Sequence, residues 1–536
     1  MVSTENVCFV LWASILIYGL TITFVSCNKI EFRIAWMAPK KEYYNLSAYS
    51  SVGALKVALT AMEQNNDLRQ IQSLKDTNIK VRWYDTDCNV KSALAAAVHA
   101  KSTFDPHLFL GPPCSVGMRG VALLASHWNT PIFGWVSQEE EFQDKTMYST
   151  LVRFLGPLNR FPKVMFHMQS LFKWSQFAVM YDKRDPYRAV ASAISEKESI
   201  ENGEQESKSW YTIVNSFKVS NDMEEKEIEQ IFLQIKRYSR IVVMALPWLD
   251  MRRYMLIAHR LGMSDGEYAF LCIHGDLYTY DKMENDVFSD RVWRRNDSYD
   301  DIAKDAFEPV LHIMMKPLEK ENWNLFKQVA IDYGNMTNPN WNLPDQHTSP
   351  DAYSPYLYDA TIMWALLTDK ILKENKKNPH DGEYMFKMAT TLTEEEEING
   401  LTGKVNLDSR GDRNLDFQVL DMSENGTFSR IITIRYFREG ERVVDFEGNK
   451  NVAEVSRWPK GKVGVQNAPP DEPVCGFDGK KCPEQDEQPD NTFIIIFSSA
   501  GSGFVIVVAI IVHCILKLKL AATKQQPYKH VEASSH

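Results

Sequence analysis

The sequence predicts an α/β protein with two doubly wound lobes and one membrane-spanning helix near the C-terminal end. Apolar runs typical of buried strands alternate with helical segments at short spacing, which is the pattern of a parallel sheet covered by helices on both faces. The alternation begins again after residue 154, which indicates a second unit of the same kind and a cleft between the two. Residues 493–516 contain no Asp, Glu, Lys or Arg, which is typical of a transmembrane helix.

The first unit is predicted from a regular succession of short elements. Alternating or wholly apolar runs predict strands at 30–36, 79–84, 107–110 and 131–135. Apolar residues at helical spacing, or Ala-rich composition, predict helices between them at 51–62, 92–101 and 116–128.

The second unit repeats the pattern and is followed by a region of different periodicity. We expect strands at 176–181, 209–218, 240–245 and 268–273, and helices at 158–172, 189–198, 224–238 and 249–261. A polar loop is predicted at 281–301, helices at 321–333 and 356–374, and a solvated acidic run at 391–397. Beyond Gly400 the period changes to two, which predicts hairpin strands at 403–407, 415–420 and 431–436.

The apolar segments also predict where the chain lies in the cell. We interpret residues 1–27 as a secretory signal peptide, with an uncleaved N-terminal anchor as the alternative. Residues 28–455 then form the ectodomain, 456–492 a juxtamembrane linker, 493–516 the transmembrane helix and 517–536 a short cytoplasmic tail rich in Lys. The expected topology is single-pass, type I, in the plasma membrane, because the alternative of a buried helix fits the length of the apolar run poorly.

Charge and glycosylation sequons agree with an extracellular location. The formal net charge of −10 argues against a nucleic-acid partner and suits a soluble acidic ectodomain. Four Asn-X-Ser/Thr sequons predict glycosylation at Asn45, Asn296, Asn335 and Asn425.

The cysteines predict one disulfide bond in the first unit. Cys88 and Cys114 each follow a predicted strand, so they should lie near each other at the carboxyl edge of the parallel sheet. Cys475 and Cys482 are seven residues apart, which favours a small intrachain loop, with a bridge between two chains as the alternative. Cys272 lies in an apolar strand, and we expect a buried thiol there.

Motifs for catalysis or for metal binding are absent from the sequence. It contains no zinc-type His or Cys cluster, nucleophile elbow, phosphate loop or kinase signature, so we expect a protein that is not an enzyme. The tripeptide 410–412 matches the integrin-recognition sequence Arg-Gly-Asp, but a turn between two strands explains it better.

Several motifs, in order, resemble the extracellular ligand-binding region of natriuretic peptide receptors and receptor guanylyl cyclases. These motifs are FLGPPC at 109–114, LASHW at 124–128, GLTG at 400–403, DSRGDR at 408–413, DMSENG at 421–426 and CGFD at 475–478. The resemblance covers residues 29–516. It implies a bilobed fold similar to type I periplasmic binding proteins, with several chain crossings between the lobes, and disulfide bonds Cys88–Cys114 and Cys475–Cys482.

The resemblance also implies a function. Members of this family bind an extracellular peptide hormone as homodimers, and the short tail predicted here matches the plan of the clearance type, which lacks a cyclase. We therefore expect a peptide receptor that acts in ligand clearance or in cyclase-independent signalling. The alternatives are a small-molecule sensor and a heterodimer partner of full-length receptor guanylyl cyclases.

Family positions transfer to particular residues of this chain. Peptide contacts are implied at Asn89, Val116, Arg119 and Leu123, although the family has an aromatic residue at the position of Val116 and an Arg at that of Leu123. A chloride ion is implied at Thr86, Pro113 and Cys114, but Pro113 has no N–H to donate. No other cofactor and no metal is expected.

Overall fold

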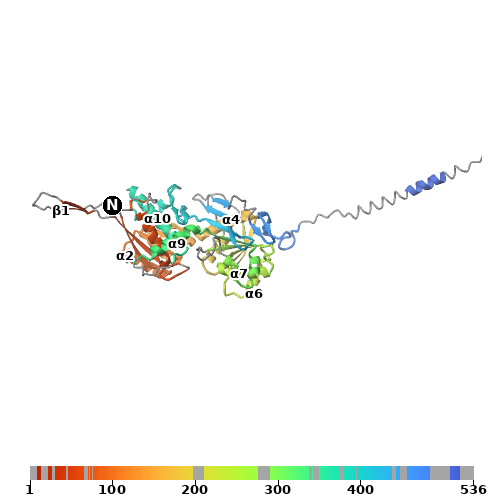
Figure 1. Ribbon diagram of the computed structural model, residues 1–536, viewed down its shortest axis with the longest axis horizontal. Helices are drawn as coiled ribbons and strands as arrows, with labels where there is room; N and C mark the ends of the chain where they lie inside the picture. The colour runs from red at the N-terminus through yellow and green to blue at the C-terminus, as the bar shows by residue number, and fades with distance from the viewer. Residues whose placement is uncertain are drawn as a thin grey trace, which may run out of the picture. The chain divides into compact units, whose positions relative to one another are not determined.

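The computed structural model describes most of the chain, and its compact part contains two lobes (Figure 1). The described residues are 9–13, 22–26, 30–43, 46–64, 71, 73–74, 77–196, 211–275, 290–336, 341, 349–374, 378–393, 395–436, 442–446, 456–482 and 508–519. The chain divides into two units, Met1–Glu472 and Pro473–His536. Both lobes belong to the first unit.

Lobe 1 contains a five-stranded parallel sheet in the order β4-β3-β5-β6-β7. The strands are β3 (Glu31–Ala38), β4 (Asn78–Asp85), β5 (Leu108–Leu110), β6 (Ile132–Gly134) and β7 (Leu151–Arg153). Successive side chains of β3 point to opposite faces. Ile34 and Trp36 pack in one core with α1 (Ala48–Gln64) and α10 (Ser354–Glu374), whereas Ala35 and Met37 pack with α2 (Val90–Thr103) and α3 (Ser115–His127).

Lobe 2 contains an eight-stranded mixed sheet in the order β17-β16-β15-β12-β11-β10-β8-β9. Its parallel strands are β8 (Gln176–Asp182), β9 (Thr212–Val219), β10 (Ile241–Ala245), β11 (Ala269–His274) and β12 (Val310–Met315). Three antiparallel strands extend it: β15 (Phe417–Met422), β16 (Phe428–Tyr436) and β17 (Arg442–Phe446).

Helices cover both faces of this second sheet. Phe177 and Val179 of β8 pack in the core that holds α4 (Phe161–Phe172) and α5 (Tyr187–Glu196). Ala178 and Met180 pack in the other core, with α6 (Glu225–Ile235), α7 (Trp248–Arg260) and α8 (Asp300–Phe307). The prediction of two α/β units is therefore correct, but the second sheet is mixed and larger than expected.

The chain passes between the lobes three times, so the lobes are not sequence halves, as the resemblance implied. It leaves β7 for α4, leaves β12 for α9 (Lys320–Gly334), and returns from α11 (Gly382–Thr390) to β15. The helices α9 and α10 pack on α1 although more than 250 residues separate them in sequence. Figure 1 shows α2, α9 and α10 together in one lobe and α4, α6 and α7 in the other.

The acidic run at 391–397 was predicted to be solvated, but its last residue, Glu397, has a buried side chain. The Glu397 side chain is only 1% exposed and forms an ion pair with Lys404 at 3.1 Å. It also accepts a hydrogen bond of 2.6 Å from the amide of Asn406. Lys404 belongs to the hairpin of β13 (Asn399–Gly400) and β14 (Gly403–Lys404), and Asn406 lies two residues beyond it, so the chain that follows the acidic run supplies both partners of Glu397.

The compact unit continues beyond residue 455, where the linker was expected to begin. Trp458 packs edge-on against Phe172 and Trp174 of lobe 2, and the Trp174 indole donates a 2.7 Å hydrogen bond to the carbonyl of Pro469. The Arg457 N–H donates to the carboxylate of Asp421 at 2.6 Å. These contacts bury aromatic surface against lobe 2, and the compact unit therefore ends at Glu472 and not at residue 455. We refer to residues 456–472 as the C-terminal strap.

The ends of the chain contain few described elements. β1 (Phe9–Ala13) and β2 (Ile22–Ser26) pair as an antiparallel ribbon. In the second unit, residues 508–519 are helical. Among the helices that the structure describes, none has both the length and the apolar character needed to cross a membrane. Residues 493–507 of the predicted span lie outside the described part.

Candidate functional site

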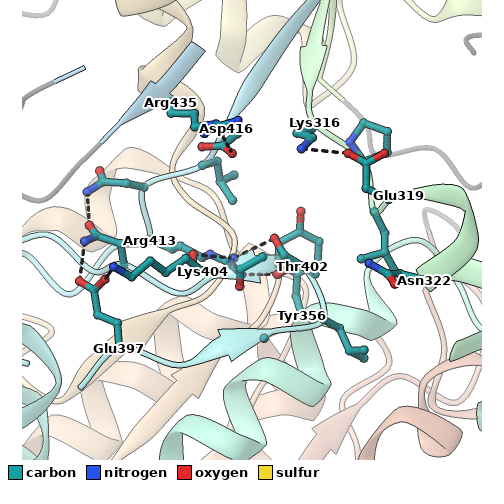
Figure 2. A pocket seen from close by; sticks show the side chains of 18 residues that line it. Lys316, Glu319, Asn322, Tyr356, Glu397, Thr402, Lys404, Arg413, Asp416 and Arg435 are labelled. Carbon is teal, nitrogen blue, oxygen red and sulfur yellow. Dashed lines mark hydrogen bonds and ion pairs between the residues drawn. The ribbon is translucent and has the colours of Figure 1, made fainter. Parts of the chain in front are cut away.

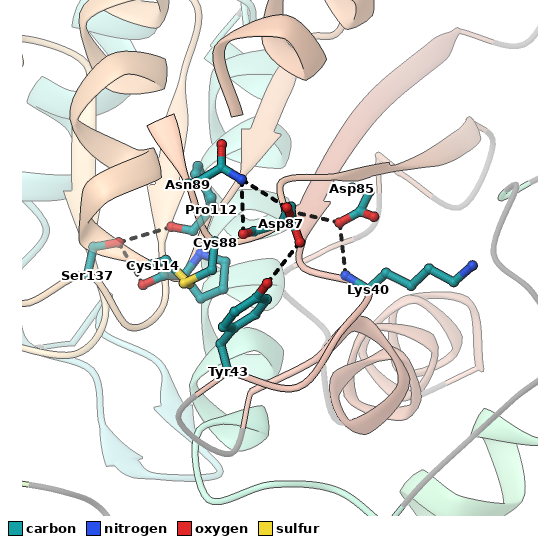
Figure 3. The surroundings of a disulfide bond; sticks show 10 residues. Lys40, Tyr43, Asp85, Asp87, Cys88, Asn89, Pro112, Cys114 and Ser137 are labelled. Atoms are coloured by element: carbon teal, nitrogen blue, oxygen red, sulfur yellow. Dashed lines mark hydrogen bonds between the residues drawn. A yellow bond between two sulfur atoms is a disulfide. The ribbon is translucent and has the colours of Figure 1, made fainter. Parts of the chain in front are cut away.

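A disulfide bond joins two loops at the carboxyl edge of the lobe 1 sheet (Figure 3). Cys88 follows β4 and Cys114 directly precedes α3, and their Cα atoms are 5.4 Å apart. Asp87, beside Cys88, adopts a positive φ of 45° and accepts a 2.9 Å hydrogen bond from the Tyr43 hydroxyl. The bridge therefore fixes the position of the first turn of α3 relative to the end of β4.

Asn89 has a structural role that its neighbours explain. Its side-chain oxygen accepts a 2.8 Å hydrogen bond from the N–H of Ser92 and so caps the N-terminus of α2. Its amide nitrogen donates to the carboxylate of Asp87 at 3.0 Å. Both ends of the side chain therefore have hydrogen-bond partners inside the protein, and capping α2 is the role that the structure shows for Asn89.

The other three implied peptide contacts lie together on the outer face of α3. Val116 is 40% exposed and Leu123 is 37% exposed. Arg119 lies between them in sequence and donates hydrogen bonds to Glu141 at 2.5 Å and to Glu139 at 2.9 Å. These acidic partners raise the pKa of Arg119.

The neighbouring helix α2 extends this apolar surface. Val90 and Val98 of α2 are 43% and 51% exposed, and α2 packs directly on α3. Positions 90, 94 and 98 follow the spacing of one helix face. We refer to Val90, Val98, Val116 and Leu123 as the α2/α3 face.

The residues implied for chloride match an anion site only in part. The Thr86 hydroxyl is fully buried and lacks a hydrogen-bond partner among the described residues, as a donor to an anion would. Pro113 cannot donate, so the pair of adjacent main-chain amides that the family uses is not present here. The residues therefore do not reproduce the family site.

A cavity of about 430 Å³ lies between the lobes, next to the disulfide bond. Lobe 1 contributes Glu139 to its lining, and lobe 2 contributes Asp185 and Arg188. Arg188 forms an ion pair with Asp185 at 2.9 Å. Burial raises the pKa of the Glu139 carboxyl; the neighbouring carboxyl groups of Glu141 and Asp185 add to the effect, and the charge of Arg119 opposes it.

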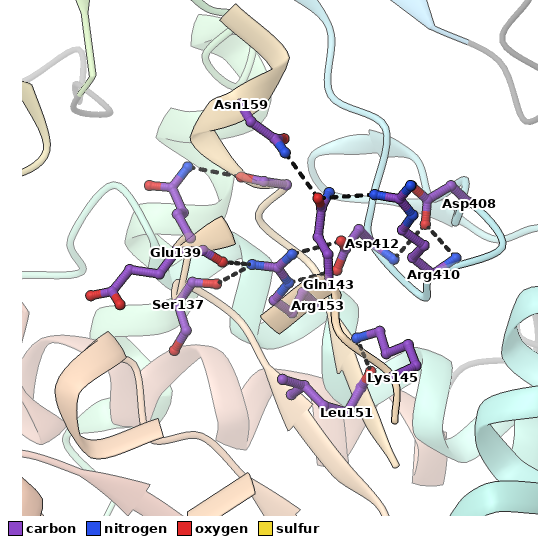
Figure 4. A network of polar contacts seen from close by, with 12 residues as sticks. Ser137, Glu139, Gln143, Lys145, Leu151, Arg153, Asn159, Asp408, Arg410 and Asp412 are labelled. Carbon is purple, nitrogen blue, oxygen red and sulfur yellow. Dashed lines mark hydrogen bonds and ion pairs between the residues drawn. The ribbon is translucent and has the colours of Figure 1, made fainter. Parts of the chain in front are cut away.

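A buried ion pair contacts the main chain of the loop that contains Glu139 (Figure 4). Arg153 donates to the carboxylate of Asp412 at 2.5 and 2.6 Å, and neither side chain is exposed. The same guanidinium donates to the carbonyl oxygens of Ser137 and Glu139, at 3.4 and 2.6 Å. The side chain of Glu139 points away from Arg153.

A second cavity, of about 380 Å³, lies beside the crossings between the lobes (Figure 2). Its charged side chains form pairs of opposite sign: Lys316 with Glu319 at 3.0 Å, Lys404 with Glu397 at 3.1 Å, Arg435 with Asp416 at 4.0 Å, and Arg413 with Asp359 at 3.2 Å. Each charged side chain of the lining thus has a partner of opposite sign.

The Arg-Gly-Asp tripeptide forms the expected turn and is not available to an integrin. The carboxylate of Asp412 is fully buried against Arg153. The N–H groups of Arg410 and Asp412 both donate to Asp408 at 2.9 Å, which closes the turn.

The remaining predicted positions are the glycosylation sequons and the other cysteines. Asn296, Asn335 and Asn425 are exposed, whereas Asn45 lies outside the described residues. Cys272 is fully buried in β11, and burial raises the pKa of its thiol. Cys475 and Cys482 are bonded within one chain, with Cα atoms 3.8 Å apart.

Comparison with known proteins defines the class of protein. The family model described as "Receptor family ligand binding region" matches residues 52–425, and the chain belongs to this family. The match confirms the resemblance inferred from the motifs.

The sequence identity to individual relatives is low. The chain is 25% identical over 442 residues to atrial natriuretic peptide receptor 3 of Homo sapiens, covering 82% of this chain and 75% of that one. Receptor-type guanylate cyclase gcy-13 of Caenorhabditis elegans is 24% identical over 451 residues, with coverage of 81% and 41%. Guanylate cyclase 2G of Mus musculus is 22% identical over 455 residues, with coverage of 82% and 38%.

The sequence analysis missed the charged groups of the cavity between the lobes. Glu139 follows β6 and Asp185 follows β8, so both lie beyond the carboxyl ends of parallel strands. The same rule located Cys88 and Cys114 and identifies such ends as ligand positions. Their proximity across the two lobes is a tertiary property with no signal in the sequence.

Proposed function

We propose that this chain is a single-pass cell-surface receptor that binds an extracellular peptide and acts in ligand clearance or in cyclase-independent signalling. Family membership and the alignment with atrial natriuretic peptide receptor 3 support a receptor whose ligand is a peptide. The single structural observation that carries the proposal is the exposure of Val116 and Leu123 on either side of Arg119.

The chemistry of this surface suits a peptide. Apolar side chains of a peptide would cover Val116 and Leu123, which are otherwise exposed to water at a cost of about 25 cal/mol per Å² of apolar area. Glu139 and Glu141, which share Arg119, supply acceptors for a basic residue or for N–H groups of the ligand. Val90 and Val98 of the neighbouring helix α2 are also exposed, and we propose that they contact a second copy of the chain in a homodimer.

Uptake of labelled peptides by cells that express the full chain tests the proposal. A panel of natriuretic peptides and other cyclic or amidated peptide hormones is offered to expressing cells and to empty cells. We expect uptake of at least one peptide above the empty-cell level, and a tenfold or greater loss in the variant V116E/L123E. Leu325→Glu is the matched control, because Leu325 is 69% exposed on α9, away from α3.

Surface labelling shows whether each variant reaches the membrane, so that a trafficking defect is not read as lost binding. The proposal is wrong if no peptide of the panel is taken up above the empty-cell level. The assignment to the α2/α3 face is wrong if uptake occurs and V116E/L123E leaves it unchanged.

A further inference from the structure

Lobe 2 exposes three large apolar side chains beside one of the predicted glycosylation sites. Leu249 and Tyr299 are each 58% exposed, and Ile302 is 43% exposed. Exposed apolar side chains that lie together, unlike single ones, mark a surface on which something packs. We propose that the N-glycan predicted at Asn296 packs over these side chains, with the apolar face of its first sugar against the Tyr299 ring. We refer to Leu249, Tyr299 and Ile302 as the α7/α8 patch.

The α7/α8 patch borders the attachment point of the glycan. Tyr299 directly precedes α8 and Ile302 lies three positions further, which is the spacing of one helix face. Leu249 lies in the first turn of α7, which packs on α8. The Leu249 carbonyl accepts a 3.3 Å hydrogen bond from the side chain of Arg295, the residue before Asn296. Both helices therefore present apolar side chains next to this asparagine.

The backbone at Asn296 is held by its neighbours. The carboxylate of Asp300 accepts hydrogen bonds of 2.8 Å from the N–H groups of Arg295 and Asn296. Arg252 of α7 donates to Asp300 at 3.0 Å and to Asp297 at 2.8 and 2.5 Å, which connects the turn to α7. Asn296 adopts a positive φ of 58°, a conformation that Asn adopts more readily than most residues. A sugar bonded to Asn296 would therefore start from a defined position.

The groups that take part in glycosylation are accessible. Asn296 and Ser298 are exposed, and no described residue forms a hydrogen bond with the side chain of either. In the reaction the Asn296 amide nitrogen forms a bond to the anomeric carbon of an N-acetylglucosamine. The bond from that carbon to the diphosphate of a lipid-linked oligosaccharide breaks, the lipid diphosphate leaves, and the amide loses one proton. The backbone hydrogen bonds of the turn are not changed by this step.

The sugar and the α7/α8 patch have complementary surfaces. One face of N-acetylglucosamine carries C–H groups, whereas its hydroxyl groups point outward from the ring. Packing of this face on Tyr299 removes apolar area from water and leaves the hydroxyl groups hydrated, so the contact stabilises the turn and the start of α8. The glycan also covers the α7/α8 patch against other proteins. This role is separate from the peptide and dimer contacts proposed for the α2/α3 face.

Hydrogen exchange tests the proposal on the full chain, expressed in cells that glycosylate secreted proteins and purified in detergent. The native chain is compared with Ser298→Ala, which removes the sequon and keeps Asn296, with Tyr299→Ala, and with the double variant. Mass spectrometry of peptides first shows whether Asn296 carries a glycan.

We expect the amides of residues 297–307 to exchange about twofold faster or more in Ser298→Ala than in the native chain, because the turn loses a packed partner. Tyr299→Ala should accelerate exchange in the glycosylated chain. Its effect should be smaller in the Ser298→Ala background, where the ring has already lost the sugar.

Tyr238→Ala is the matched control. Tyr238 is 53% exposed and follows α6, at the edge of the sheet where β10 begins, whereas α7 starts beyond the other end of β10. Its replacement should leave exchange of residues 297–307 unchanged, with the glycan and without it.

Three results would overturn the proposal: no glycan at Asn296, exchange of residues 297–307 unchanged in Ser298→Ala, or an effect of Tyr299→Ala that is equal in the glycosylated and unglycosylated chains. None of these measurements involves peptide uptake. The failure of either proposal therefore leaves the other standing.

Discussion

Arg153 and Asp412 form a bidentate ion pair at 2.5 and 2.6 Å in which neither side chain is exposed to solvent. The two residues are 259 positions apart, on β7 and on the segment that returns from lobe 1 to lobe 2. The Arg153 guanidinium also binds the carbonyl of Glu139, whose side chain lines the cavity between the lobes. One buried pair thus connects a chain crossing to the candidate site (Figure 4).

Breaking this pair should cost a large share of the stability of the first unit. Asp412→Asn leaves the Arg153 charge buried without a countercharge, and we expect the free energy of unfolding to fall by about 3–5 kcal/mol. Urea unfolding followed by tryptophan fluorescence measures the change.

The control for this variant is an exposed pair of the same kind. Lys183 and Asp222 are 48% and 76% exposed and 3.4 Å apart, so Asp222→Asn should leave the unfolding midpoint unchanged. Equal effects of the two variants would show that burial of the Arg153 pair does not matter for stability.

Removal of the Cys88–Cys114 bond should destabilise the first unit. The bond closes a loop across 26 positions, for which the chain-entropy model predicts about 3–4 kcal/mol. The double variant C88A/C114A should therefore unfold at a lower urea concentration than the native chain. C475A/C482A removes the bond of the second unit and should leave this transition where it is; a shift of equal size in both variants would contradict the assignment.

Protonation of Asp421 should make a stabilising contribution that grows as the pH falls, whereas the buried histidines, whose pKa values are lowered by burial, act in the opposite direction. Burial raises the pKa of this carboxyl from 3.8 to about 7, with N–H donors from Arg457 and Met422 opposing the shift. The folded chain therefore binds more protons than the unfolded chain between these pH values, and the free energy of unfolding rises as the pH falls through this window. Burial raises the pKa of Asp351 to about 6, and this group acts in the same direction.

The difference between the native chain and Asp421→Asn isolates the contribution of this group. Unfolding midpoints are compared at pH 8 and at pH 5.5, and the stability of the native chain relative to that of the variant should be greater at pH 5.5 than at pH 8. A difference between the two proteins that is the same at both pH values would mean that Asp421 does not titrate in this range.

The contact between α1 and α9 requires a glycine. A methyl group added at Gly53 would lie 2.1 Å from the carbonyl oxygen of Ala330, and backbone cannot rotate away as a side chain can. Gly53→Ala should therefore lower the free energy of unfolding by about 1–3 kcal/mol, although alanine has the higher helix propensity.

Gly120→Ala is the matched helical control. The nearest atoms to its added methyl group belong to the flexible side chain of Leu94, at 2.7 Å. We expect a smaller loss than for Gly53→Ala in the same urea titration. A stabilised Gly53→Ala variant would show that α1 and α9 are further apart than the structure places them.

Local pattern was sufficient to predict most of the strands and helices that alternate up to residue 275, because each has the period or the apolar run of its type. It was insufficient for β7, which has only three residues, and for β12, α8 and α11. The helices α8 and α11 are only 8 and 9 residues long, and β12 is a short apolar run interrupted by His312, so periodicity does not identify them. The strap was missed because its Pro, Gly and charge content is that of a linker, while a few aromatic contacts determine its position.

The sequence by itself determined the α/β class, the two lobes, the likeness to a receptor family and the proximity of Cys88 and Cys114, because these follow from periodicity, motif order and the geometry of parallel sheets. Only the tertiary structure decided that Glu397 and Asp412 are buried, that Asn89 caps a helix and that Glu139 and Asp185 line one cavity. The physical reason is that burial and charge pairing depend on segments brought together by three chain crossings, and no local pattern records such distant contacts.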